Sequence, residues 1–560
     1  MFLRVSFAGV SFAGVSLACA AAFPGAFVAS ATGQVRWTAV ALSGQRAPGT
    51  PEGVVFTAGF RQAQLHEAGD IAFLAQITGP GVDAANDVAL WRGRPLQLVR
   101  IAREGDAIED STLAGFSTFI LDSSEHITFA GYTAGQTSGL FTRTSARYDT
   151  LSLYGGTIPG PLPGWSWRGP SAFAASERIT AGVYRSFGPR SWPADCVIGY
   201  SNGGEMRAVA YGGDPAAGFP VGTTYSSFAL CDISPSGEFL FTGQALSANG
   251  VSRSAIWAAR DSDIRLHAAV HEPAPTGVPG ALFTDIGPPW MTTDGRIFFM
   301  AFTTSNLGPC LFEGQAGSPR LALRGPIRVT GLESGWTAHL GRNIALSPGG
   351  NSILIEISPR NADGQSFLNG LASGGIDSLR FVARLGEPSP GYPSGTIFSS
   401  FNPVQFHSSD TGFAAFTASV RVRENETSTG AWAASPSGDI ELLAGAGVSF
   451  MVAPGDFRTV QRVQLMARGS SGPMNARALD VHGRVALILN FTDGSSGVFL
   501  AQIPVPCRVD FDDSGGIDGG DVEAFFYAWA ASEIRADMNL DGGIDGSDIA
   551  VFFDLWQEGC

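Results

Sequence analysis

Two acidic stretches close to the C-terminus have the residue types and spacing that hold a calcium ion. They are DFDDSGGIDGGD at residues 510–521 and DMNLDGGIDGSD at residues 537–548. Ca²⁺ takes about six to eight oxygen atoms, so a loop that binds it points alternate side chains inward and needs a glycine at position 6 for a sharp turn. Both stretches have oxygen-bearing side chains at positions 1, 3, 5, 9 and 12 and glycine at position 6. The sequence therefore predicts two Ca²⁺ ions, one in each loop.

The candidate ligands form two matching sets, each of which includes the seventh residue of its loop. They are Asp510, Asp512, Ser514, Gly516, Asp518 and Asp521 in the first loop and Asp537, Asn539, Asp541, Gly543, Asp545 and Asp548 in the second. A hydroxyl is a poorer ligand than a carboxylate, so Ser514 weakens the first site, and the second loop should bind Ca²⁺ more tightly. The alternative interpretation is a solvated acidic tail, and the repetition of the full pattern argues against it.

Helices must hold these loops in place. Apolar residues recur at helical spacing after each loop, namely Val522, Phe525, Phe526 and Trp529, and then Ile549, Phe552, Phe553 and Trp556. We expect the two apolar stripes to pack on each other. A disulfide between Cys507 and Cys560 would tie off the ends of this segment, which is too small to bury a large core.

The end of each loop resembles a known module. The usual EF-hand loop closes with Glu at position 12, whereas Asp521 and Asp548 close these loops and an apolar helix follows each. This arrangement resembles the type I dockerin, in which a loop-plus-helix unit occurs twice. The terminal Gly559-Cys560 resembles the GC-type dockerin found at the ends of exported bacterial proteins. The resemblance implies that residues 505–560 bind a protein partner of the cohesin type, or an envelope component.

Negative charge is concentrated in the same segment. Residues 507–560 hold ten Asp, three Glu and two Arg, a net charge of −11, which leaves −4 of the chain's −15 for the first 506 residues. The chain has no Lys, so all 35 basic residues are Arg. This excludes a P-loop lysine and a Schiff-base lysine. Because no basic tract is present to neutralise phosphates, we do not expect a nucleic-acid partner.

The N-terminus reads as an export signal over residues 1–31. One Arg precedes a small, apolar, Ala-rich run, with cleavage patterns after Ala20 or Ala31. A lipoprotein site at Cys19 is an alternative, although Ser16 stands where an aliphatic residue is usual. No later stretch is apolar and long enough to predict a transmembrane segment. The protein is therefore expected to be secreted or attached to the cell surface or envelope by bacterial-type export, where disulfides form.

The body of the chain repeats one short phrase, a polar turn followed by an apolar strand. The eight copies are HEAGDIAF (66–73), DSSEHITF (122–129), AASERITA (174–181), SPSGEFLF (234–241), TTDGRIFF (292–299), SPGGNSIL (347–354), SDTGFAAF (409–416) and DVHGRVAL (480–487). The flanking sequence supplies about three more strands around most copies. Repeated four-stranded sheets that each pack against a neighbour on both faces are typical of a β-propeller. We therefore assign residues 32–504 to a β-propeller.

The two ends of this region complete each other. The last unit stops after GVFLAQI (497–503) and lacks its final strand, which VRWTAVALSGQRAPG (35–49) would supply. Pairing the two would close the ring and leave no exposed sheet edge. A mainly β fold with eight blades is therefore the first choice, followed by a small α-helical calcium module. Seven blades, a β-solenoid or two smaller barrels are the alternatives, because the third and sixth units are degenerate.

The phrase resembles the tandem NxxGxxAF repeat of exported bacterial proteins whose C-terminal anchors vary. His66-x-x-Gly69-x-x-Ala72-Phe73 matches the glycine, alanine and phenylalanine but not the asparagine. The resemblance covers nearly all of residues 33–503 and implies no known chemistry. Glycine for the turn and aromatic residues between the sheets are sufficient reasons for the pattern.

Other candidates for chemistry are weaker. The G-x-S-x-G pattern at 199–203 lies between two apparent strands and predicts a hairpin rather than a nucleophile turn. His267 and His271 would share one face of a strand, but no further ligand is near in sequence, so a surface or inter-blade role suffices. Among three other cysteines, Cys196 and Cys231 could form a disulfide, which would leave Cys310 as a buried free thiol.

These observations favour an exported, non-catalytic propeller that a calcium-dependent, dockerin-like module attaches to a partner. The first alternative is a polysaccharide-degrading or other hydrolase that is docked through the same module. It would need two carboxylates about 5 to 10 Å apart, and the sequence does not select such a pair. The second alternative is a purely structural module that binds no partner.

Overall fold

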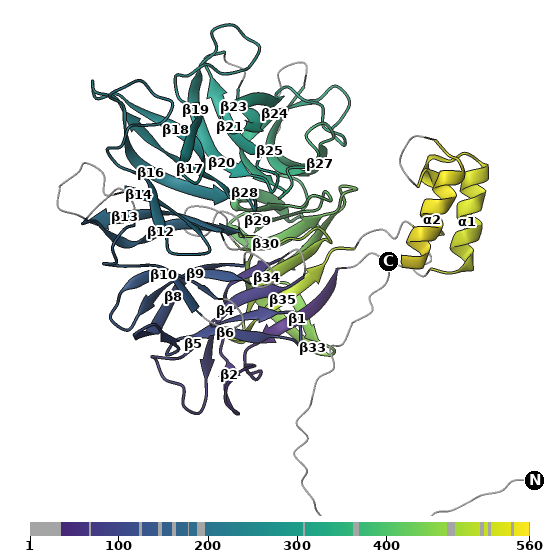
Figure 1. Cartoon of the computed structure of the whole chain (residues 1–560). Helices are drawn as coiled ribbons and strands as arrows, with labels where there is room; N and C mark the ends of the chain where they lie inside the picture. Colours follow the sequence, from purple (N-terminus) through teal and green to yellow (C-terminus); the bar gives the residue numbers. More distant parts are fainter. Residues whose placement is uncertain are drawn as a thin grey trace, which may run out of the picture.

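The computed structural model describes the chain from residue 35 to residue 558 with internal gaps. The described ranges are 35–66, 69–121, 126–143, 148–159, 164–176, 179–187, 196–305, 308–361, 369–466, 476–504, 509–512, 517–538 and 543–558. The proposed export signal, Cys507 and Cys560 lie outside them. Eight antiparallel sheets form the ring of a β-propeller, and two helices follow at the C-terminus (Figure 1). The prediction of a mainly β, eight-bladed propeller is confirmed.

The first four blades are built from the N-terminal half of the propeller. The first blade contains β2 (Val55–Phe56), β3 (Arg61–Leu65), β4 (Ile71–Thr78), β5 (Val88–Gly93) and β6 (Val99–Arg103), and the second contains β7 (Ala107–Ile108), β8 (Ser111–Leu121), β9 (Ile127–Thr133), β10 (Ser138–Arg143) and β11 (Tyr148–Leu153). The third blade contains β12 (Ser166–Ser176), β13 (Ile179–Phe187), β14 (Cys196–Asn202) and β15 (Arg207–Tyr211). The fourth contains β16 (Thr224–Ile233), β17 (Glu238–Leu246), β18 (Ser252–Arg260) and β19 (Asp263–Ala269).

The other four blades follow in sequence order. The fifth blade contains β20 (Phe283–Met291), β21 (Ile297–Thr303), β22 (Cys310–Gln315) and β23 (Ser318–Arg324), and the sixth contains β24 (Thr337–Leu346), β25 (Ile353–Arg360), β26 (Gly370–Gly374) and β27 (Arg380–Arg384). The seventh blade contains β28 (Ile397–Ser408), β29 (Ala414–Arg423), β30 (Glu426–Ala434) and β31 (Ile440–Gly445). The eighth contains β32 (Ser449–Ala453), β33 (Asp456–Gln464), β34 (Arg484–Phe491) and β35 (Ser496–Gln502), together with β1 (Arg36–Leu42) from the start of the chain.

The ring closes through strands from opposite ends of the propeller sequence. β1 pairs antiparallel with β35, from Arg36 opposite Gln502 to Leu42 opposite Gly497. The eighth blade therefore has the order β1-β35-β34-β33-β32. This is the closure that the incomplete last repeat predicts. It removes the exposed edge that β35 would otherwise present for pairing with another chain.

The recurring phrase forms the turn and second main strand of each blade. Its glycine has a positive φ in all six copies that carry one, which are Gly69, Gly237, Gly295, Gly350, Gly412 and Gly483. Glycine adopts this conformation at no steric cost, whereas a side chain is strained there. In the two copies with glutamate in this place, Glu125 and Glu177 lie outside the described residues. The turn chemistry thus explains why the phrase keeps its glycine.

Five of the eight copies of the phrase end on a phenylalanine, and most of these rings stack against an aromatic ring of the next strand. In four blades the ring planes lie within 16 to 18° of each other, and the centroids are 5.4 to 6.2 Å apart. The pairs are Phe73 with Trp91, Phe241 with Trp257, Phe299 with Phe312, and Phe416 with Trp432, and every one of these side chains is fully buried. Each pair is directly opposite in the strand register. The expected role of these aromatics, filling the space between sheets, is confirmed.

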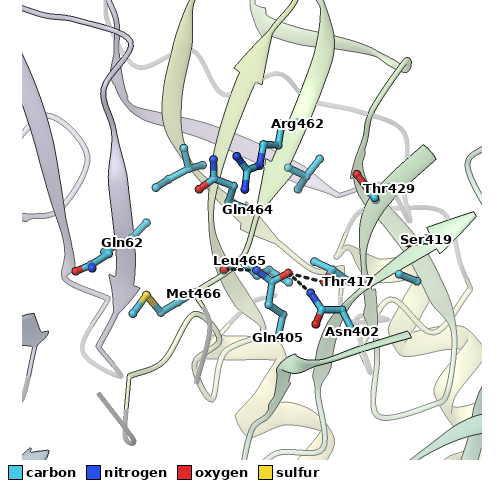
Figure 2. A pocket seen from close by; sticks show the side chains of 15 residues that line it. Gln62, Asn402, Gln405, Thr417, Ser419, Thr429, Arg462, Gln464, Leu465 and Met466 are labelled. Atoms are coloured by element: carbon cyan, nitrogen blue, oxygen red, sulfur yellow. Dashed lines mark hydrogen bonds between the residues drawn. The ribbon is translucent and has the colours of Figure 1, made fainter. Parts of the chain in front are cut away.

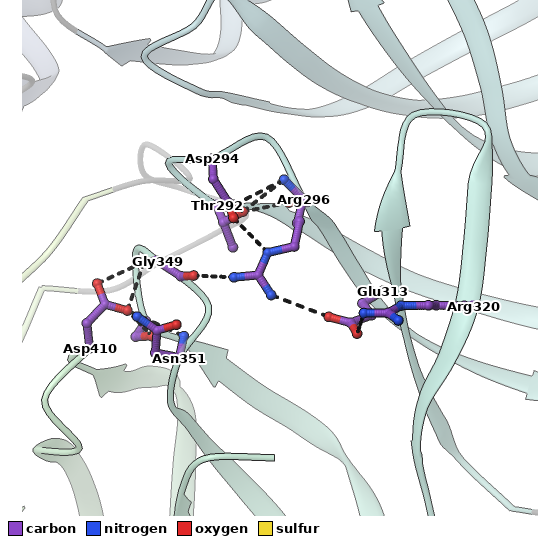
Figure 3. A network of polar contacts seen from close by, with 9 residues as sticks. Thr292, Asp294, Arg296, Glu313, Arg320, Gly349, Asn351 and Asp410 are labelled. Atoms are coloured by element: carbon purple, nitrogen blue, oxygen red, sulfur yellow. Dashed lines mark hydrogen bonds and ion pairs between the residues drawn. The ribbon is translucent and has the colours of Figure 1, made fainter. Parts of the chain in front are cut away.

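The same turns join neighbouring blades through polar contacts (Figure 3). Arg296 of the fifth blade donates from Nη2 to the carbonyl of Gly349 in the sixth at 2.6 Å, and it pairs with Asp294 at 2.8 Å. Asp410 of the seventh blade accepts from the Gly349 amide at 2.9 and 2.8 Å and from the Ser347 hydroxyl at 2.6 Å. Three consecutive blades are therefore connected at one glycine-containing turn.

The C-terminal segment is helical, as the apolar stripes predict. It contains α1 (Gly519–Ala530), the short 3-10 helix η1 (Ile534–Ala536) and α2 (Gly546–Glu558). The rings of Phe525 and Phe552 stack between the helices with centroids 4.1 Å apart. Within the described residues, no helix is long and apolar enough to span a bilayer.

Candidate functional site

Three carboxylates of the first acidic loop converge. Asp510, Asp512 and Asp521 each offer one oxygen, and these oxygens lie within 4.8 Å of one another. Asp521 is fully buried, Asp510 is partly buried and Asp512 is exposed, so the group opens to one side. Carboxylate oxygens are hard ligands that suit Ca²⁺ and not a soft metal. The described part of the loop therefore has a donor set that fits the predicted ion.

The start of α1 holds Asp521 in place. Asp518 caps the helix and accepts from the Gly520 amide at 2.7 Å, while Asp521 accepts from the Asp518 amide at 2.8 Å, which completes a capping box. The other oxygen of Asp521 accepts from the amides of Phe511 at 2.6 Å and Asp512 at 3.2 Å. One buried carboxylate thus ties both ends of the loop together. The oxygen that accepts from Asp518 has one further lone pair for a cation.

The second loop repeats this arrangement where it is described. Asp548 is fully buried and accepts from the Asp545 amide at 2.8 Å, the same contact that Asp521 makes with Asp518. Asp545 accepts from the amide and hydroxyl of Ser547, and these hydrogen bonds hold the pKa of its carboxyl below the usual value. Asp537 is also buried. The two helix starts therefore bring their closing aspartates to equivalent positions.

Four of the predicted ligands cannot be placed. These are Ser514, Gly516, Asn539 and Asp541, which lie outside the described residues, whereas Gly543 lies within them, in the second loop. The proposed Cys507–Cys560 disulfide also lies outside them. The same holds for the Cys196–Cys231 disulfide, because neither side chain is described. Cys310 is a buried free thiol, as expected, and burial raises its pKa.

The two helices form one small core beneath the loops. Phe511, which follows the first ligand, packs edge-on against Phe525 at 5.4 Å and Phe552 at 6.2 Å. Trp529 of α1 donates its indole N–H to the carbonyl of Asp545 in the second loop at 2.9 Å. The expectation that the apolar stripes pack on each other is confirmed. Each loop is consequently in contact with the helix of the other unit.

The minor candidates have structural roles. The 199–203 pattern begins in β14, which pairs antiparallel with β15, so it is the predicted hairpin. His267 is buried, and its Nδ1 accepts from the Gly317 amide of the next blade at 3.2 Å, which is the expected inter-blade role. The prediction that His271 shares its strand face is wrong. β19 ends at Ala269, and His271 lies in the following turn with φ of 69°.

A cavity of about 420 Å³ lies among three blades of the ring (Figure 2). Its described lining consists of Gln62, Ala63, Asn402, Gln405, Thr417, Ala418, Ser419, Thr429, Gly430, Arg462, Val463, Gln464, Leu465, Met466 and Ile488. These come from β3, β28, β29, β30, β33 and β34 and the segment after β33. Sequence reasoning missed this cavity, since its residues lie far apart in the chain and form no motif.

The cavity is polar but has no acid or base in its described lining. Amides and hydroxyls line it, and Arg462 is the one charged side chain there. Gln405 is fixed by three contacts: its Oε1 accepts from Asn402 at 3.2 Å and Thr417 at 2.5 Å, and its Nε2 donates to the Leu465 carbonyl at 2.9 Å. Such a wall suits recognition of a polar ligand.

A family model matches residues 31–315 and 343–508. The chain belongs to DUF7453, a family of unknown function. The DUF7453 match covers the propeller except residues 316–342 and ends before the acidic loops. No curated protein matches this chain.

Several solved structures share a distant likeness with this DUF7453 protein. A puromycin hydrolase is 11% identical with a TM-score of 0.36, over 74% of this chain and 60% of the hydrolase. A puromycin-hydrolyzing peptidase of Mycobacterium tuberculosis is 11% identical with a TM-score of 0.34, over 77% and 58%. An ulvan lyase is 12% identical with a TM-score of 0.30, over 83% and 95%. The chain thus spans less than two thirds of the first two enzymes, and these scores carry no argument about activity.

Proposed function

We propose that this protein is an exported, non-catalytic β-propeller whose C-terminal module binds two Ca²⁺ ions and attaches it to a protein at the cell surface. The observation that carries the proposal is the convergence of Asp510, Asp512 and Asp521 at the start of α1. The same spacing recurs at Asp537 and Asp548. The dockerin resemblance supports a partner of the cohesin type or an envelope component.

The carboxylates and helices of the module explain how metal would control it. Bound Ca²⁺ would supply positive charge that offsets a net charge of −11 in residues 507–560. Without it, Asp510, Asp512 and Asp521 repel one another across less than 4.8 Å. Asp521 and Asp548 would then hold their loops less firmly. The loops would no longer fix the orientation of α1 relative to α2. Helix orientation, and with it the binding surface, would depend on calcium.

The choice of a non-catalytic propeller rests on the cavity chemistry. A glycoside hydrolase needs a pair of carboxylates about 5 to 10 Å apart, and the described lining of the cavity contains none. Arg462 and amides can bind a ligand but cannot exchange a proton with it near neutral pH.

A pull-down from the envelope fraction of the source cell tests the attachment. The full chain should retain a protein when Ca²⁺ is present and release it when a chelator is added. The double variant Asp521→Ala/Asp548→Ala should fail to retain that protein, whereas Asp554→Ala, an exposed aspartate on α2, should behave as the unaltered chain does. Retention that is equal with and without chelator would refute calcium-dependent attachment. Ca²⁺ binding without any retained protein would leave the module as a stabilising element only.

A further inference from the structure

The cavity of Figure 2 lies where the first, seventh and eighth blades meet. Gln62 comes from β3, Asn402 and Gln405 come from β28, and Arg462 and Gln464 come from β33. Each of these strands pairs with the strand that carries the repeated phrase of its blade. They therefore occupy equivalent places in their blades, and the cavity forms only when the ring is closed.

Arg462 is the distinctive residue of this site. Arg462 and Gln464 are alternate residues of β33, so their side chains leave the strand on the same face, and both line the cavity. Arg462 makes no ion pair with a described residue, in contrast to Arg458 on the same strand, which pairs with Asp456 at 2.6 Å. A guanidinium with free N–H groups in a pocket is suited to a planar carboxylate, which it binds through two parallel hydrogen bonds.

The wall formed by β28 and β29 is fixed before any ligand arrives. Because Gln405 accepts from Asn402 and Thr417 and donates to Leu465, its amide cannot rotate without loss of three hydrogen bonds. Among the described residues, Asn402 keeps its carbonyl oxygen and one N–H for a ligand. A wall set in advance reduces the ordering cost of binding.

The polar groups of the cavity both donate and accept hydrogen bonds. Asn402 and Gln464 offer amide groups, and Thr417, Ser419 and Thr429 offer hydroxyls. Ligand hydroxyl groups also donate and accept, so they match such a surface better than an inorganic anion, which only accepts from protein donors. The volume of about 420 Å³ falls in the range of small-molecule sites.

From these contacts we infer that the cavity binds a small hydroxylated carboxylate of the sugar-acid class, with its carboxylate on Arg462 and its hydroxyls on the wall of Asn402 and Thr417. This goes beyond attachment, because it gives the propeller a ligand of its own. It does not depend on the calcium module. No described carboxylate lines the cavity to repel the anion.

Isothermal titration of the full chain with galacturonate and glucuronate tests the inference. Galactose and glucose serve as neutral counterparts, sulfate as an inorganic anion, and trialanine as a peptide carboxylate. The uronates should bind about tenfold or more tightly than the neutral sugars, because a hydrogen bond to a charged group is stronger than a neutral one. Arg462→Gln should lose that preference. Arg265→Gln, at an exposed position of β19, should bind as the unaltered chain does.

Thr417→Val provides a second variant in which the charge is retained. It removes one contact of Gln405, so uronate binding should weaken while the preference for an anion remains. Uronate binding should also be unchanged by a chelator, which separates this inference from the calcium proposal. Absence of uronate binding, equal binding by Arg462→Gln and the unaltered chain, or tighter binding of glucose, sulfate or trialanine would each overturn it.

Discussion

The rings of Phe525 and Phe552 stack with their centroids 4.1 Å apart and their planes 9° from parallel. Each is the sixteenth residue of its own loop-plus-helix unit, counted from Asp510 or Asp537. Phe511 packs edge-on against both rings. One aromatic contact therefore joins two units that each carry a candidate metal loop. Binding at one loop should favour order in the other.

The first prediction concerns this contact. Phe552→Ala should destabilise the module by about 3 to 5 kcal/mol, because a fully buried ring is replaced by a cavity. It should also weaken Ca²⁺ binding at the first loop, although no ligand of that loop changes. Calcium titration of the full chain measures both sites. Tyr527→Ala is the matched control, since Tyr527 is 70% exposed. Unchanged affinity at the first loop would show that the units act independently.

The two loops should differ in affinity. Asn539 and Asp541 supply oxygens in the second loop where the first has Asp512 and Ser514, so the second should bind Ca²⁺ more tightly. Asp548→Ala should therefore cost more calcium affinity than Asp521→Ala, and Asp554→Ala should cost none. Calcium titration of the three variants gives the order directly. The reverse order would overturn the ranking.

Blade-to-blade contacts should contribute to the stability of the ring. Asp410→Ala leaves the Gly349 amide and the Ser347 hydroxyl without their acceptor, which should cost about 1 to 3 kcal/mol. Urea unfolding measures the loss. Asp377→Ala is the control because Asp377 is exposed. Equal unfolding midpoints for the two variants would mean that solvent replaces the lost contact without penalty.

His267 should make the propeller sensitive to acid. Burial lowers the pKa of His267 to about 4, below the ordinary value of about 6.5. The folded ring therefore binds a proton less readily than the unfolded chain does. Its contribution to stability is present above a pH of about 6.5 and is lost as the pH falls toward about 4.

The variant His267→Gln should flatten this part of the stability profile. A protonated ring would also present an N–H to the Gly317 amide, which now donates to Nδ1. The effect should be on the order of 1 to 3 kcal/mol across that interval, measured as urea midpoints at several pH values. His482→Gln is the control, since His482 is exposed. Parallel profiles for the unaltered chain and His267→Gln would contradict the assignment.

The propeller ring can be predicted from the sequence because the residues that form each blade are close together in the chain and recur in every unit. A glycine such as Gly69 sets six of the eight turns, and an apolar residue such as Phe73 ends every copy of the phrase, so eight copies predict eight sheets. The missing strand of the last unit predicts the pairing of β1 with β35. The degenerate third and sixth units still form four-stranded sheets, because their neighbours in the ring supply packing on both faces.

The sequence does not predict features that depend on distant residues. Gln62 and Arg462 line one cavity although 400 positions separate them. His271 looked like a strand residue, but a turn with positive φ begins after Ala269. The acidic loops stand out in the sequence because their candidate ligands lie within twelve residues of one another. Local spacing therefore predicts the candidate metal loops, whereas only the closed ring reveals the cavity.

The most direct test of the account is the far-ultraviolet circular dichroism of the full chain in Ca²⁺ and in chelator. The β-sheet signal of the propeller should be the same in both, so the difference spectrum reports α1 and α2. The account predicts more helix with Ca²⁺, and no difference in Asp521→Ala/Asp548→Ala. Identical spectra of the unaltered chain in both conditions would contradict calcium-coupled folding of the module.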